Sequence, residues 1–115
     1  MSGYDVNKSQ VSDNARAEFL EAHLNHDLES IPGIGPATAK KLKEAGIESS
    51  FQLVGQFLFL STNISTCQDV CDEMWYFLQE RGVSAHRSGI VQCIAEKCET
   101  AFPTIFTGTP SSDSK

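Results

Sequence analysis

The sequence contains no apolar run approaching the ~20 consecutive residues that a membrane-spanning helix needs, so we expect no membrane insertion. The opening segment, Met1-Ser2-Gly3-Tyr4-Asp5, also lacks the basic-then-apolar pattern of a secretory signal peptide. We therefore expect a protein of the nucleus and cytoplasm. The chain has 115 residues, 40% of them hydrophobic, which is enough for one domain with a modest core.

Basic residues are scarce: nine lysines and arginines stand against 15 aspartates and glutamates, giving a formal net charge of −6. Residues 1–29 carry six acids and two bases (−4), and residues 61–115 carry seven acids and four bases (−3). Residues 30–60 reach +1, with three lysines at 40, 41 and 43 against glutamates at 44 and 48. The chain as a whole therefore attracts a polyanion weakly, and the lysine-bearing segment is the one suited to hold it.

Zinc-site spacings are also missing. Four cysteines occur as Cys67-x3-Cys71 and Cys93-x4-Cys98, neither of which is a common zinc pattern, and both pairs fall in helix-patterned stretches. We interpret them as buried thiols that act as small hydrophobic side chains, in preference to a zinc site or a structural disulfide. We expect no metal and no cofactor.

Strand-like alternation with period two is absent, whereas helical periodicity recurs, so the predicted fold is all-α. We expect a compact five-helix single domain over residues 13–102, between a flexible segment (1–12) and a disordered Thr/Ser/Pro-rich tail (103–115). The predicted helices cover 13–24 with Asp13 or Asn14 as cap, Pro36 to Gly46, Ser49–Leu60, a Ser65/Gln68 capping box to Gly82, and a last one from near Ser84 with Ile90, Ile94, Cys98 and Ala101 along one side.

The predicted helix Ser49–Leu60 is apolar on two faces. One face combines Phe51, Val54 and Leu58, and the other combines Leu53, Phe57 and Leu60. A helix that is apolar on two sides must be buried on two sides. Because a domain of this size has few ways to do that alone, we expect a subunit interface here.

The most specific motif spans Leu28–Ile47 and reads Leu-x-x-Ile-Pro-Gly-Ile-Gly-Pro-x-x-Ala-Lys-Lys-Leu-x-x-x-Gly-Ile, a helix-hairpin-helix. Gly33 and Gly35 permit backbone conformations and close approaches that a Cβ atom would block. Ile34 can turn inward and fix the hairpin. The amides around it, together with the start of the Pro36 helix, then form an anion site suited to a DNA phosphate.

This site predicts duplex binding that ignores sequence and weakens steeply with salt, because phosphate contacts carry no direct sequence information. Lys40 and Lys41 would add charge toward neighbouring phosphates. Two plainer interpretations remain open. The Gly-Ile-Gly segment would merely make a tight helix–helix turn, and the lysines would form a solvated helix face.

The hairpin resembles those of ligases, repair nucleases and polymerases, and the residues after it narrow the likeness. Val54-Gly55-Gln56-Phe57-Leu58-Phe59-Leu60 and the ending Cys93…Cys98-Glu-Thr-Ala-Phe102 resemble the barrier-to-autointegration factor family, over about residues 16–102. The resemblance implies a SAM-like helical homodimer that bridges and compacts double-stranded DNA and serves chromatin and nuclear assembly. It also implies LEM-domain proteins, lamins and histones as partners.

The resemblance further assigns site residues. It implies DNA contacts at Gly33, Ile34, Gly35, Lys40 and Lys41, with a second phosphate contact where Ser84, His86 and Arg87 fall. It implies a dimer interface at Gly55, Phe57, Leu58, Leu60 and Trp75. Tyr76 is the alternative to Trp75 as the interfacial aromatic residue. Two departures stand out: only Lys8 and Arg16 are available as N-terminal basic residues, and the stretch between Leu60 and Gly82 is about six residues longer than the family pattern.

We weigh two functions and set aside a third. The intact hairpin favours a DNA-bridging dimer, whereas the charge of −6 favours an interaction module that binds LEM-domain, histone or family-member partners with little DNA affinity. Catalysis is not expected, since His23 and His26 lie near acids without any nucleophile–base signature.

Overall fold

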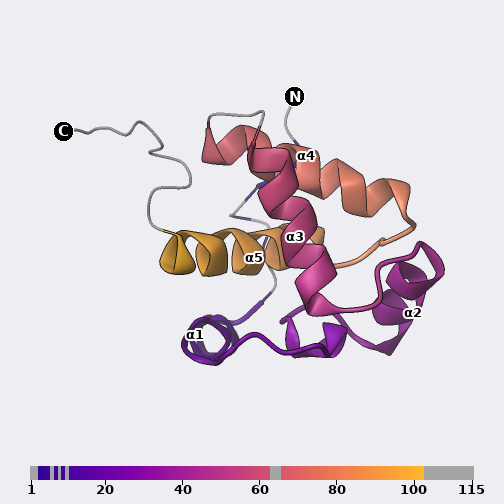
Figure 1. Ribbon diagram of the computed structural model, residues 1–115, viewed down its shortest axis with the longest axis horizontal. Coiled ribbons are helices and arrows are strands. Elements are labelled where there is room, and N and C mark those ends of the chain that lie inside the picture. The colour runs from indigo at the N-terminus through magenta and orange to yellow at the C-terminus, as the bar shows by residue number, and fades with distance from the viewer. Residues whose placement is uncertain (1–2, 6, 8, 10, 63–65, 103–115) are drawn as a thin grey trace.

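A computed structural model describes residues 3–5, 7, 9, 11–62 and 66–102, which form five α-helices and one short 3-10 helix (Figure 1). In chain order these are α1 (Asp13–Glu21), η2 (Leu28–Ser30), α2 (Pro36–Glu44), α3 (Ser50–Ser61), α4 (Cys67–Glu80) and α5 (Arg87–Ala101). These residues contain no strand, so the all-α prediction is confirmed. The tail at 103–115 lies outside the described residues, and its disorder stays a prediction.

Helix α5 runs through the centre of the molecule, in contact with α1, α3 and α4 (Figure 1). Every residue from Ser88 to Ala95 is buried, as is Cys98. The sequence predicted burial along only one side of this helix, but all sides of its first half are buried. Ala101, which was placed on the buried side, is exposed. Because neighbours enclose its first half on all sides, the burial of α5 there does not follow the usual amphipathic stripe.

The other helices each bury one face against this centre. Fully enclosed side chains come from every part of the chain between η2 and α5, and include Leu28, Ile31, Leu42, Leu53, Phe57, Met74, Leu78 and Ile90. They form one continuous core. The single-core domain expected from the length is thus realised by helix-on-helix packing.

The first helix differs from its prediction at both ends. Its N-cap is Ser12, not Asp13 or Asn14, because the Ser12 hydroxyl accepts the N–H of Ala15. It ends at Glu21, not at residue 24, because Ala22 is already extended.

Helices α4 and α5 also begin differently. The Ser65 of the predicted capping box lies outside the described residues; the N-cap of α4 is Thr66, whose Oγ1 accepts the N–H of Asp69. Helix α5 starts at Arg87, three residues after the predicted Ser84, because His86 adopts a left-handed conformation with φ 61°.

The predicted helix ends at Gly46 and Gly82 are confirmed to within two residues. After α2, the amide of Ile47 donates to the carbonyl of Leu42 at 2.8 Å, and that of Gly46 donates to Lys43. After α4, Val83 and Gly82 repeat this pattern. Both ends are Schellman motifs, which satisfy the last carbonyls of each helix.

All four cysteines are free thiols; Cys71, Cys93 and Cys98 are buried and Cys67 is half-buried. Cys67 and Cys71 lie one turn apart on α4, with 3.8 Å between their Sγ atoms. Over the described ranges, no group of three histidine, cysteine or acidic residues is placed to hold a metal ion. In the same ranges, no helix has the length and apolar character to cross a membrane.

Described residues of the N-terminal segment lie against α4 and α5. The Tyr4 amide donates to Asp72 at 3.1 Å, and the Asp5 amide donates to the Ser88 hydroxyl at 3.2 Å. A Cβ atom on Gly3 would come within 2.4 Å of the Trp75 ring. These contacts extend the core outward over α4, while the flexibility predicted for residues 1–12 stays a prediction.

Candidate nucleic-acid interface

The hairpin between η2 and α2 has the conformation that its glycines suggested. Gly33 has φ +95°, a backbone region that residues with a Cβ atom rarely adopt. A Cβ atom there would also approach Ile90 Cγ1 to 2.9 Å. Ile34 turns inward and is buried, and its amide closes the turn onto the Ile31 carbonyl at 3.0 Å. Position 33 thus requires glycine for both conformation and space.

Gly35 serves a different purpose. It is the N-cap of α2, with an extended backbone (φ −97°, ψ −173°) that other residues can adopt. A Cβ atom there would meet nothing within 4 Å. The protein's own packing therefore does not demand glycine at this position, whereas the close approach of an outside molecule would.

The first turn of α2 leaves donors open beside Gly35. The Ala39 amide is the first to bond within the helix, to the Gly35 carbonyl at 2.9 Å. Gly35 has no side chain with which to cap the preceding amides of Ala37 and Thr38. These two donors point out at the positive end of the helix dipole, which favours an anion.

A shallow surface pocket lies over this turn. Its lining consists of Gly33, Ile34, Gly35, Pro36, Ala37, Thr38 and His86. The lining contains no carboxylate, and the imidazole of His86 is its one ionisable group. The hairpin and the start of α5 thus meet at one concave, anion-compatible surface.

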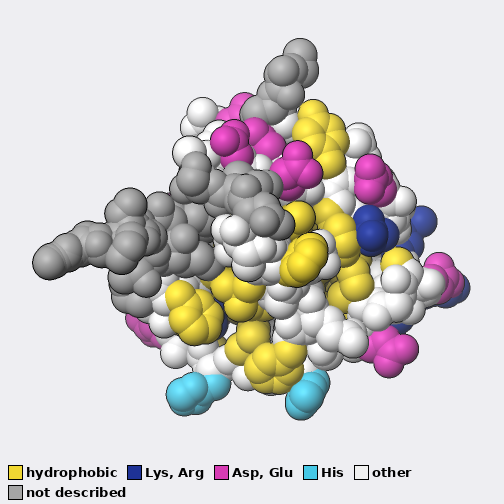
Figure 2. Space-filling model, turned by 45° about the horizontal axis from the view of Figure 1, so that its top comes forward, with side chains coloured by type: hydrophobic (Ala, Val, Ile, Leu, Met, Phe, Trp, Pro, Cys, Tyr) yellow, Lys and Arg dark blue, Asp and Glu magenta, His cyan; other side chains and the backbone are white. Residues whose placement is uncertain are grey.

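The lysines of α2 lie on the same helix as part of this pocket but outside its lining. Lys40, Lys41 and Lys43 are all exposed, and none takes part in an ion pair with another described residue. Figure 2 shows lysine and arginine side chains at one edge of the molecule, with acidic side chains among them. Counting from Pro36, Lys40 and Lys41 lie about one turn into the helix. Lys40 and Lys43 line a separate surface hollow together with Glu29 and Glu44.

The three residues of the second predicted phosphate contact have different surroundings. Ser84 is exposed but does not line the pocket. Arg87 turns inward: its Nη1 donates to the Val83 carbonyl at 2.6 Å, and its guanidinium carbon lies 4.2 Å from the centroid of the Trp75 ring. His86, which lies between them in the sequence, is the residue of the three that reaches the pocket.

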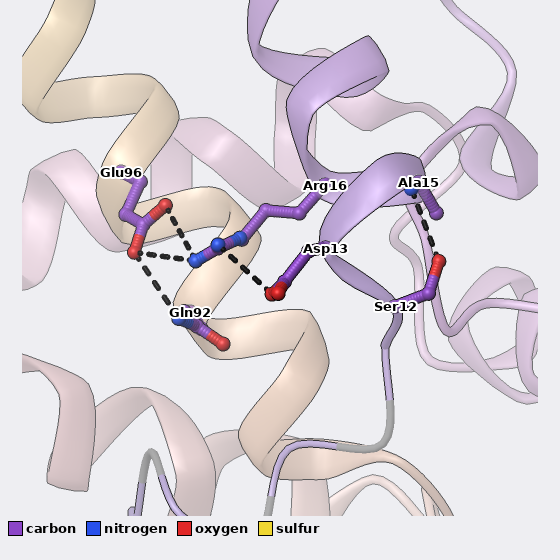
Figure 3. Close-up of polar contacts among 6 residues, drawn as sticks. All are labelled: Ser12, Asp13, Ala15, Arg16, Gln92 and Glu96. Atoms are coloured by element: carbon purple, nitrogen blue, oxygen red, sulfur yellow. Dashed lines mark hydrogen bonds and ion pairs between the residues drawn. The ribbon is translucent and has the colours of Figure 1, made fainter.

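The N-terminal cation Arg16 is occupied by carboxylates (Figure 3). Its Nη1 lies 3.3 Å from Glu96 Oε2 and its Nη2 lies 3.2 Å from Asp13 Oδ1. Gln92 donates to the same Glu96 at 3.2 Å. Arg16 therefore joins α1 to α5, and it contributes little net charge to an outside ligand. Lys8, the other N-terminal base, lies outside the described residues.

The residues assigned to a dimer interface differ in exposure. Phe57 is fully enclosed by the chain's own core, Leu58, Leu60 and Trp75 are half-buried, and Gly55 is exposed. Sequence reasoning did not single out Phe59, although its side chain is 63% exposed, the most of any large hydrophobic residue described. Phe51 is 45% exposed, and Figure 2 shows such hydrophobic side chains on one face. Helix α3 thus buries one apolar face and leaves part of the other uncovered.

The two histidines of the N-terminal half lie at the surface. His23 is exposed beside α1, and the ring of His26 packs edge-on against Phe51 with 4.8 Å between centroids. These surroundings are those of surface histidines.

Comparison with known families agrees with this geometry. A family model described as barrier to autointegration factor matches residues 9–101, which include every helix of the structure. Neither a curated protein nor a solved structure matches the chain. The chain belongs to the barrier-to-autointegration factor family.

Proposed function

We propose that this chain binds double-stranded DNA through its phosphates, without choice of sequence. The observation that carries the proposal is the first turn of α2, where no side chain caps the amides of Ala37 and Thr38. The N-cap residue is Gly35, and the space where a Cβ atom would lie is empty. Membership of the barrier-to-autointegration factor family supports the same function. The role is that of a binding protein, not an enzyme.

In this proposal one phosphate group sits over Gly33–Thr38, and Lys40 and Lys41 face its neighbours along the strand. Amides and lysines recognise the charge and spacing of the backbone. Arg87 is engaged with Val83 and Trp75, so it is not presented to base edges. Binding therefore depends on salt and is indifferent to sequence.

The proposal includes a homodimer that joins two duplexes, or two parts of one. The exposed aromatic side chains of α3 support it, because apolar surface of this kind is usually covered by a partner. Two hairpins in one dimer would hold two duplex segments together. A chromatin and nuclear-assembly role, with LEM-domain proteins, lamins or histones as partners, follows from family membership and belongs to the proposal.

The test is duplex-DNA affinity measured against salt concentration, for the native chain and for a Lys40→Gln/Lys41→Gln variant. The native chain should lose affinity steeply with salt, and the variant's log–log slope should be smaller by about one to two units. Lys43→Gln is the matched control, since Lys43 lies nearly a full turn further from the pocket and should change the slope less. No binding of the native chain even near ~50 mM salt would reject the proposal, because phosphate contacts are strongest there.

That negative result would favour the alternative, a family member that acts through protein partners with weak or no DNA binding. Two observations favour it: the net charge of −6 and the neutralisation of Arg16 by Glu96 and Asp13. A LEM-domain protein, a histone or another family member would then be the ligand to test.

A further inference from the structure

We propose that protonation of His86 strengthens the binding of duplex DNA, so that the affinity is higher at mildly acidic pH. The inference rests on the proposed function and adds a regulatory property to the same site. Its basis is the position of His86, on the wall of the pocket that the hairpin amides line.

The backbone fixes His86 at this wall. A Cβ atom on Gly33 would lie 3.3 Å from His86 Cβ, so the histidine stands directly against the hairpin. Its carbonyl accepts the Ile90 amide at 2.9 Å, which ties it to the first turn of α5. The side chain is nevertheless exposed, so an imidazole there can meet a phosphate that rests on the Ala37 and Thr38 amides.

No other charge of the described residues competes at the pocket lining. On α5, Arg87 is bound to the Val83 carbonyl. On the N-terminal segment, Asp5 lies outside the lining, and its carboxylate accepts the amide of Asn7 at 2.9 Å. On α2, Lys40 and Lys41 lie one turn beyond the lining and are exposed. His86 is therefore the ionisable side chain of this lining.

Histidine is the side chain whose charge normally changes between about pH 5 and pH 8. The imidazolium form donates from both ring nitrogens and attracts a phosphate, whereas the neutral form offers one donor and no charge. A bound phosphate also favours the protonated form, because an opposite charge nearby stabilises it. Protonation and DNA binding therefore reinforce each other, and affinity falls as pH rises.

The experiment measures duplex affinity and its salt dependence at about pH 5.5 and about pH 8, the two sides of histidine titration. The native chain should bind roughly three- to tenfold more tightly at the lower pH, the gain expected from one charge-assisted contact. Its log–log salt slope should also be steeper by about 0.9, since one more phosphate is neutralised.

Two substitutions at position 86 isolate the effect. His86→Asn removes the charge and keeps a residue that tolerates the left-handed backbone, so both differences between the two pH values should vanish. His86→Lys fixes the charge, so tight binding should persist at the higher pH. The double variant His23→Gln/His26→Gln keeps His86 and should behave like the native chain. Melting curves at both pH values establish that each variant is folded.

The outcomes separate the two proposals. Salt-sensitive binding that responds equally to pH in the native chain and in His86→Asn would overturn the role of His86 and leave the proposed function intact. Binding that is independent of pH in the native chain would do the same. Absence of salt-sensitive binding at both pH values would overturn the proposed function, and the role of His86 with it.

Discussion

Lys97 donates a hydrogen bond from its Nζ to the Phe19 carbonyl at 2.8 Å, which ties α5 to the C-terminal end of α1. The same ammonium group bonds the carbonyls of Leu20, at 3.2 Å, and Ala22. These carbonyls lie at or just past the last turn of α1, where no further helical amide can reach them. The Lys97 ammonium group thus bonds the free carbonyls at the end of α1 and interacts favourably with the negative end of the α1 dipole.

Replacement of Lys97 by methionine should therefore destabilise the fold. We expect the free energy of unfolding to fall by about 1.5–3 kcal/mol, the range for hydrogen bonds to a charged group. Urea denaturation followed by circular dichroism measures it. Lys43→Met is the control, since Lys43 is exposed and should change stability by less than about 0.5 kcal/mol. Equal effects of the two substitutions would show that Lys97 does not support α1.

Gly35→Asp should separate folding from DNA binding. An aspartate at the N-cap of α2 can accept the Thr38 amide and stabilise the helix, and its Cβ atom meets no obstacle. The same carboxylate occupies and repels the proposed phosphate position. We expect a melting temperature at least equal to that of the native chain, together with loss of duplex binding.

Gly35→Asn is the matched neutral variant, because it caps the same amide without a charge. It should bind DNA more weakly than the native chain and more tightly than Gly35→Asp. If Gly35→Asp retains native affinity, the phosphate does not lie over the first turn of α2.

Phe59→Glu should disrupt the proposed dimer without harming the subunit. Phe59 is 63% exposed in the single chain, so a charge there costs the core nothing, whereas Phe57 is fully enclosed and its replacement would disturb folding. Analytical ultracentrifugation should give the mass of two chains for the native protein and of one for the variant. Asn14→Glu adds the same charge at an exposed position of α1, away from the residues assigned to the interface, and should leave the native mass. A dimeric Phe59→Glu protein would place the interface elsewhere.

The buried thiols should resist alkylation in the folded state. Burial raises the pKa of Cys93 to about 11 and that of Cys98 to about 12, and burial followed by the neighbouring Cys67 raises the pKa of Cys71 further. At about pH 8 these groups are thiols and lack the nucleophilic thiolate. Iodoacetamide followed by mass spectrometry should modify the half-buried Cys67 first, and all four cysteines in denaturant. Rapid native modification of Cys93 or Cys98 would contradict this burial.

Local patterns predicted much of the fold and the hairpin. Pro36 and Gly46 mark the ends of α2 to within two residues, and Ile34 lies inward as its position between two glycines suggested. These features depend on conformational restrictions of neighbouring residues, which a sequence displays directly. The apolar character of α3 was likewise predictable, but its buried residues Leu53, Val54 and Phe57 combine members of both predicted faces.

Features set by contacts distant in sequence were not predictable in the same way. The end of α1 depends on Lys97, 75 residues beyond Ala22, and the inward turn of Arg87 depends on the position of the Trp75 ring. The place of His86 beside Gly33 follows from how α5 meets the hairpin. The sequence shows that such residues are basic or aromatic, but which of them face solvent depends on how the helices pack.

The hairpin packs at Gly33 against Ile90 of the central helix, and Ile90 is fully buried. We therefore expect that opening of the hairpin would expose Ile90. A duplex that binds only the closed hairpin therefore acts as a folding ligand, and at a hundredfold excess over Kd it would add about 2.7 kcal/mol to the free energy of unfolding. Substitutions deep in α5 would then weaken DNA retention without touching DNA, and bound DNA would in turn protect the amides of α5 from hydrogen exchange.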